Sequence, residues 1–186
     1  MRAEVESRAR LNALARSVRA AAWFAALGQD LTAGEKDDVA FYLIGLGMTG
    51  LGFALVSDWH EASRVADHPD WDRDWLKHED DLRLGLLARA AAVIGGKAAA
   101  MAAISPITDE AAKVLPGMAA EAGARFGMVE PGPIKAAIGA AAHAVYLAAL
   151  AQAAGADDQH PFVRKLALFR AGHWPLVVLG GRFYLF

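Results

Sequence analysis

The chain has 186 residues, a formal net charge of −2 and no cysteine. This length suits one folded domain over residues 1–186, and a chain without cysteine has neither disulfides nor thiolate metal sites nor a cysteine nucleophile. Alanine, the strongest helix former, accounts for 43 residues. We therefore expect an all-α, multi-helix bundle with about four long helices and two or three short ones. The nearly balanced charge gives no global field toward nucleic acid, so we expect no nucleic-acid partner.

The N-terminal part of the chain contains signals for two helices. Apolar residues recur at helical spacing over residues 3–27 and predict a helix that stops at Gly28. Thr32 and Glu35 have the spacing of a capping box, which predicts that a second helix begins near residue 33. Four glycines between positions 45 and 52 disfavour a continuous helix, so we expect a kink or break within that range.

The same glycines also match a dinucleotide-binding loop. Gly45, Gly47 and Gly50 follow the apolar run 39–44 with the spacing G-x-G-x-x-G. That motif works within alternating strands and helices, and the later sequence shows no such alternation. We therefore interpret the segment as a glycine-notched helix packed against a neighbour, and we expect no cofactor.

The middle of the chain contains several residues that are typical of the start or the end of a helix. Asp58 is placed to cap a short helix, and a long helix should run from about 70 to 103 with a bend at Gly95–Gly96. Ser105–Pro106 resembles a helix start, and the short helix that follows should break before Pro116. Further on, Pro133 opens a long helix that reaches Ala154 and stops at Gly155, and a last helix spans 161–171.

Two uncharged stretches, Val39–Ser57 and Ala136–Ala156, are long enough to cross a bilayer. The first is the more hydrophobic, but acidic residues flank it on both sides and no cluster of lysine or arginine follows it. The N-terminus lacks the apolar segment of a signal peptide. We interpret both stretches as core helices, and expect a soluble cytoplasmic protein with no membrane partner.

The C-terminal residues 174–186 predict a β-hairpin appended to the helices. Two β-rich runs flank Gly180–Gly181, which suits a tight turn. The expected pairs are Leu179 with Arg182, Val178 with Phe183, Val177 with Tyr184, and Leu176 with Leu185. One face should then lie on the core, and the other should form a contact surface in a homodimer or with another protein. The predicted contact residues are Val177, Leu179, Arg182, Tyr184 and Phe186.

No catalytic motif is present, and the histidines and acids lack the helical spacing of a metal site, so we expect no metal. The leading hypothesis is therefore a protein–protein interaction module, either an adaptor or a self-associating protein. The alternative is a small-ligand-binding protein or enzyme with a pocket between helices. His143 lies on an alanine-rich helix and is the strongest candidate for such a pocket, together with Tyr146 and His60.

Overall fold

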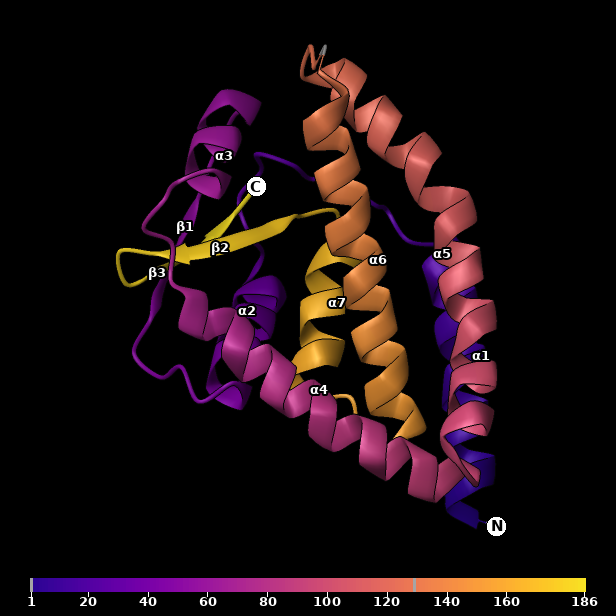
Figure 1. Cartoon of the computed structure of the whole chain (residues 1–186). Coiled ribbons are helices and arrows are strands. Elements are labelled where there is room, and N and C mark those ends of the chain that lie inside the picture. Colours follow the sequence, from indigo (N-terminus) through magenta and orange to yellow (C-terminus); the bar gives the residue numbers. More distant parts are fainter. Residues whose placement is uncertain (1, 129) are drawn as a thin grey trace.

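Helices dominate the structure. In the computed structural model, which describes residues 2–128 and 130–186, 67% of the chain is helical, and seven helices accompany a small three-stranded sheet (Figure 1). This confirms the predicted mostly-α bundle. The helices are α1 (Arg2–Arg19), α2 (Ala33–Gly45), α3 (Trp59–Ala66), α4 (Arg73–Ile94), α5 (Lys97–Arg125), α6 (Pro131–Ala153) and α7 (Pro161–Ala171). The strands are β1 (Gly52–Leu55), β2 (Pro175–Leu179) and β3 (Arg182–Leu185).

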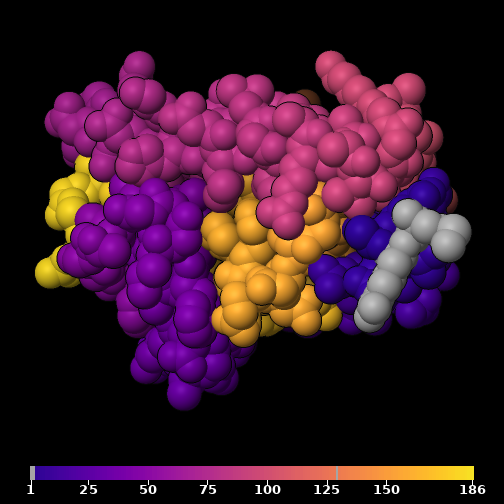
Figure 2. Space-filling model, turned by 90° about the horizontal axis from the view of Figure 1, so that it is seen from below, coloured from indigo at the N-terminus to yellow at the C-terminus, as the bar shows by residue number. Residues whose placement is uncertain are grey.

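The alanine-rich helix α6 lies at the centre of the bundle. It packs against α1, α4, α5 and α7, and Figure 1 shows it between α5 and α7. Most of its buried residues are alanines, whose short side chains let neighbouring helices approach closely. From below, Figure 2 shows α4 along one side of the molecule and the segment around residue 160 between α1 and α2.

The first helix is shorter than the sequence indicates. It ends at Arg19, and the prediction that it continues to residue 27 is wrong. The loop that follows buries Trp23 and Phe24, with Phe24 in a left-handed conformation at φ 59°. Backbone N–H groups of this loop donate to carbonyls at the C-terminal end of α7. Burial of two aromatic side chains and these tertiary hydrogen bonds therefore outweigh the local preference of alanine for helix.

The second helix begins and ends as predicted. Thr32 and Glu35 form the capping box, and the helix ends at Gly45, which confirms the expected break. The chain then turns through two glycines with positive φ, Gly47 and Gly50, instead of resuming a helix. A Cβ atom at Gly45 would lie 2.8 Å from the ring of Pro161 at the start of α7. The interpretation of a glycine notch packed against a neighbouring helix is therefore confirmed at Gly45 alone. It is wrong for Gly47 and Gly50, which lie in the turn and have nothing within 4 Å of an added Cβ.

The long central helix is divided in two. Gly95 ends α4 at φ 97°, and α4 and α5 meet at an angle of 103°, which confirms the predicted bend. The expected helix start at Ser105 and the break before Pro116 are wrong, because α5 runs through both Pro106 and Pro116. Both prolines are solvent-exposed, so water can reach the carbonyls that lose a helical donor, and the packing of α5 on α1 and α6 holds the helix together.

The remaining predicted helix signals are confirmed. Asp58 caps α3 by accepting a hydrogen bond from the backbone N–H of Glu61 at 2.8 Å. The helix predicted from Pro133 is α6, which begins at Pro131 and is capped by Ala154 ahead of Gly155. The last helix ends at Gly172, whose φ of 107° favours glycine.

The C-terminal hairpin is part of a three-stranded sheet with the order β1–β3–β2, in which the unpredicted strand β1 runs parallel to β3. The pairs Leu179–Arg182 and Val178–Phe183 are confirmed. Beyond them an irregularity shifts the register so that Pro175 opposes Leu185. The predicted pairing of Leu176 with Leu185 is therefore wrong. Leu176 and Val177 lie in the irregular stretch, where only Tyr184 of β3 remains opposite them, so the pairing of Val177 with Tyr184 stays a prediction.

This register changes which predicted contact residues are accessible. Phe186 is fully buried and Val177 is 8% exposed, so both belong to the interior and not to an outer face. Arg182 is exposed, and Leu179 and Tyr184 are half-buried. The contact surface therefore stays a prediction only for these last three residues.

Of the described helices, α6 is long and apolar enough to cross a membrane by length and composition, although half of its most apolar window is buried in the chain. The bent pair α4 and α5 passes the same test only if taken as one broken span. The stretch Val39–Ser57, the better candidate by sequence, is divided between α2, a turn and β1 and is not a single helix.

Candidate functional site: a buried ion pair beside a small cavity

A polar cluster lies inside the bundle where α2, α4 and α7 meet. Oε1 of Glu79 accepts hydrogen bonds from the Tyr42 hydroxyl at 2.8 Å and from Lys165 Nζ at 2.7 Å. The indole N–H of Trp75 donates to the Tyr42 oxygen at 2.5 Å. Lys165 Nζ also lies 5.0 Å from the ring centre of Trp75 and 5.5 Å from that of Tyr42, within cation–π range. The lysine charge is therefore held by one carboxylate and two aromatic rings.

Both charges of this pair are removed from solvent. The side chains of Glu79 and Lys165 are only 4% and 7% exposed, and Tyr42 is fully buried. Burial and the neighbouring Glu79 carboxylate raise the pKa of Tyr42 well above its ordinary value, so the hydroxyl keeps its proton and donates it. A buried ion pair adds little net stability compared with apolar residues of similar size. Stability alone therefore does not account for its presence in an alanine-rich core.

The second carboxylate oxygen of Glu79 has a different environment. Oε2 is buried and has no hydrogen-bond partner among the described residues. Glu79 also lines a cavity of about 280 Å³ between α4 and α6. The residues around this cavity are Leu76, Glu79, Asp80, Arg83, His143 and Leu147. Glu79 thus lines the cavity together with two leucines, and its Oε2 is a buried acceptor without a partner among the described residues.

The charges around the cavity cancel. Arg83 pairs with Asp80 at 2.6 Å, as Lys165 pairs with Glu79. Although part of the His143 ring is exposed, partial burial and then the charge of Lys165 lower its pKa, against the opposing influence of Glu79. Since its ordinary value is already below 7, His143 is neutral at neutral pH.

The structure brings only part of the predicted ligand-binding set together. His143 lines the Glu79 cavity, and the ring of Tyr146 stacks beside it with centroids 6.4 Å apart. Tyr146 itself lines a neighbouring hollow beside Met101 on α5. His60 lies elsewhere, in a hollow between α3 and Phe126, so the expected single pocket for all three residues is wrong.

Glu79 and Lys165, at the centre of the site, are not among the residues predicted from the sequence, although the sequence contains a signal for them. Glu79 lies four residues after Trp75 and seven before Leu86, on the buried stripe of α4. Lys165 lies between Phe162 and Phe169 at apolar helical spacing. One charged residue at a core-facing position of each of two helices, with opposite signs, is typical of a buried ion pair.

Within residues 2–128 and 130–186, no group of three or more histidines and acids is placed to hold a metal ion. Comparison with known proteins gives no match: no family model, no curated protein and no solved structure is significantly similar to this chain. The chemistry of its cavities is therefore what bears on its function.

Proposed function

We propose that this protein binds a small neutral molecule in the Glu79 cavity, a molecule with an apolar body and one O–H or N–H donor. The observation that supports this is the buried Oε2 of Glu79, which lacks a protein partner. Leaving such an acceptor unsatisfied costs about 1–3 kcal/mol, and a ligand donor would recover that free energy. Cofactor chemistry and catalysis form no part of the proposal.

The surroundings of the carboxylate support the neutral, partly apolar character of the ligand. Each acid that lines the cavity already has a basic partner, so a charged ligand would enter without a counter-charge. Leu76 and Leu147 provide apolar contact for the body of the ligand. His143, neutral at neutral pH, can donate or accept a second hydrogen bond.

Phenol and toluene test the proposal, because they have similar shapes and differ in one hydroxyl. We expect calorimetric titration to show saturable phenol binding and weaker toluene binding. In the double variant Glu79→Leu/Lys165→Met, phenol should bind at least about tenfold more weakly, since that factor corresponds to the free energy of one hydrogen bond to a charged group. Toluene should bind the double variant at least as well as the original protein.

The matched control is Glu121→Leu, which removes an exposed acid on α5 away from the cavity and should leave phenol binding unchanged. Failure of phenol to bind the original protein would contradict the proposal. Equal affinity for phenol in the original protein and the double variant would also contradict it, because the carboxylate would then play no part.

A second candidate function is self-association through the sheet. It is supported by β1, an outer strand of the sheet whose residues are exposed or half-buried. The other outer strand, β2, is buried over Pro175–Val178, and its Val178 carbonyl already accepts a hydrogen bond from the backbone N–H of Asp72. Phe53 on β1 is 38% exposed, and Leu179, Arg182 and Tyr184 remain accessible on the hairpin. Light scattering of a Tyr184→Glu variant tests this candidate.

A further inference from the structure

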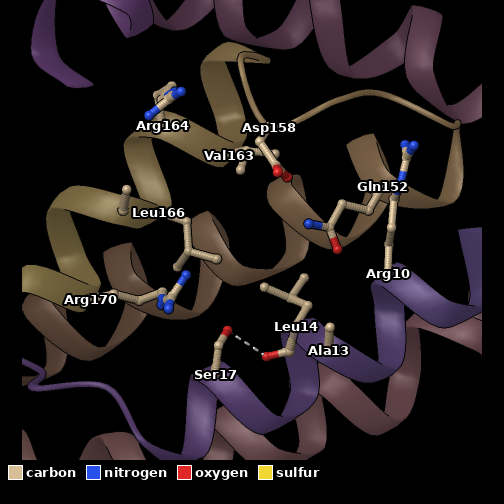
Figure 3. Close-up of a pocket in the computed structure, with 11 residues that line it drawn as sticks. Arg10, Ala13, Leu14, Ser17, Gln152, Asp158, Val163, Arg164, Leu166 and Arg170 are labelled. Carbon is tan, nitrogen blue, oxygen red and sulfur yellow. Dashed lines mark hydrogen bonds between the residues drawn. The ribbon is translucent and has the colours of Figure 1, made fainter. Parts of the chain in front are cut away.

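A second cavity, of about 430 Å³, lies between α1, α6 and α7 (Figure 3). Leu14 and Leu166 form its apolar side, with Ser17 beside them. Polar groups come from three other places in the chain: Gln152 on α6, Asp158 in the loop after it, and Arg170 near the end of α7. This cavity shares no lining residue with the Glu79 cavity.

Two opposite charges border this cavity without pairing. Neither Arg170 nor Asp158 forms an ion pair in the part of the chain that the structure describes, and Figure 3 shows them on different sides of the cavity. The other two arginines are already engaged. Arg10 donates to the carbonyl of Ala156 at 2.6 Å, and Arg164 pairs with an aspartate of α2 at 2.7 Å. The carbonyl does not neutralise the charge of Arg10, but only Arg170 and Asp158 among the charged lining residues have side chains without a partner in the described part of the chain, and both are exposed to solvent.

Gln152 adds an independent sign of a ligand. Its side chain is only 8% exposed, and its Oε1 has no hydrogen-bond partner among the described residues. In Figure 3 the amide extends into the cavity between Asp158 and Leu14. A buried acceptor of this kind is costly unless a donor reaches it. In Figure 3 the amide group lies beside Asp158 with its oxygen turned away from that carboxylate, so Oε1 would reach a ligand cation at Asp158 after rotation of the amide.

We infer that this cavity binds an aliphatic amino acid. The ligand carboxylate pairs with the guanidinium of Arg170, which can donate two parallel hydrogen bonds to it. The ligand ammonium pairs with Asp158 and donates to Oε1 of Gln152, and the aliphatic side chain packs on Leu14 and Leu166. A zwitterion matches the two unpaired charges, whereas a simple anion or cation would satisfy only one of them.

L-Leucine and two relatives test this inference by calorimetric titration. 4-Methylpentanoate is leucine without the ammonium group, and isoamylamine is leucine without the carboxylate. We expect saturable binding of leucine and binding at least about tenfold weaker for each relative, because each leaves one charge of the cavity unpaired. The same loss is expected for leucine in the variants Arg170→Met and Asp158→Asn.

Two exposed neighbours give matched controls. Arg16→Met on α1 and Asp157→Asn beside Asp158 make the same chemical changes outside the cavity lining, and should leave leucine affinity unchanged. Gln152→Leu removes the buried acceptor, so it should weaken leucine binding while raising the melting temperature of the free protein.

The inference is overturned if leucine does not saturate the original protein, or if Arg170→Met and Asp158→Asn bind leucine as tightly as the original protein does. Binding of 4-methylpentanoate as tight as that of leucine would also overturn it, because the cavity would then recognise only an anion. The result does not depend on the Glu79 cavity, since the Glu79→Leu/Lys165→Met variant should bind leucine normally.

Discussion

Lys165 and Glu79 bury two opposite charges in a core that otherwise consists largely of alanine and leucine. The attraction between them offsets the loss of hydration only while both are present. The two residues therefore affect stability as a pair, and their separate removal differs from their joint removal.

We expect Lys165→Met alone to reduce the free energy of unfolding by about 3–5 kcal/mol, because it leaves Glu79 charged and buried without a partner. The double variant Glu79→Leu/Lys165→Met should lose much less, since it replaces the pair by apolar side chains. Urea denaturation of the original protein, both single variants and the double variant measures the coupling. Additive losses in the double variant would contradict a coupled pair.

We expect the free energy of unfolding to decrease in acid because of three histidines. Burial is the largest cause that lowers the pKa of His143, His160 and His173, whose ordinary value is 6.5. Below about pH 6.5 the unfolded chain therefore binds more protons than the folded chain, and the free energy of unfolding decreases as the pH falls. The slope fades over about one pH unit above 6.5, where the histidines of the unfolded chain also lose their protons.

His173 gives the sharpest test of this effect, because it is 1% exposed and its Nδ1 has no partner among the described residues. The nearby Glu35 carboxylate, 3.6 Å from Nε2, opposes the effect of burial without reversing it. His173→Phe should flatten the decline in unfolding free energy between about pH 6.5 and about pH 5. Urea denaturation across that range measures the slope, and an unchanged slope would exclude His173 as a contributor.

At the scale of elements, local signals predicted where most helices begin and end, and tertiary contacts account for the errors. The caps at Thr32 and Asp58 depend on neighbours within one helical turn, so the sequence alone reveals them. The early end of α1 depends on where Trp23 is buried, which no local pattern contains. Strand β1 pairs with β3, far along the chain, and its four residues, which include a glycine and an alanine, give only a weak strand signal.

The cavity residues likewise divide into those that a local sequence pattern identifies and those that only tertiary packing brings together. His143 was found because it is a lone titratable residue on an alanine-rich helix. Glu79 and Lys165 are 86 positions apart in sequence, and their contact depends on how α4 and α7 are placed relative to each other. Arg170 and Asp158 belong to no motif, and only the packing of α1 and α7 on α6 places them around one cavity.

Two glycines in helices should respond oppositely to replacement by alanine. Gly45→Ala would bring Cβ to 2.8 Å from the ring of Pro161, and such overpacking costs roughly 1–3 kcal/mol. Gly85→Ala lies in the middle of α4 with nothing within 4 Å of the new Cβ, so it should stabilise the protein by about 0.4–1 kcal/mol. Thermal unfolding compares the two. An unchanged melting temperature in Gly45→Ala would mean that α2 and α7 are not tightly packed at this position.

At the scale of the whole molecule, the buried residues form one hydrophobic cluster that extends from α1 to the C-terminal residue. The hairpin is part of this core and not an addition to it. Strand β3 is the central strand of the sheet, since it pairs with both β1 and β2. Trp174 and Phe186 also exchange backbone hydrogen bonds, and both rings pack against Trp59 of α3.

Deletion of residues 180–186 should therefore unfold the protein, whereas Tyr184→Glu should not. The deletion removes Phe183, Leu185 and Phe186, each with no exposed surface. Burial of each such side chain contributes about 1.5–3 kcal/mol, so their joint loss is comparable to the roughly 5–15 kcal/mol that stabilises a typical domain.

Tyr184 is only half-buried, so its replacement by Glu should preserve the helical circular dichroism signal and a cooperative melt. Light scattering of the same variant then decides the second candidate function. A dimer that becomes a monomer supports contact through the sheet, and a monomer before and after the change excludes it.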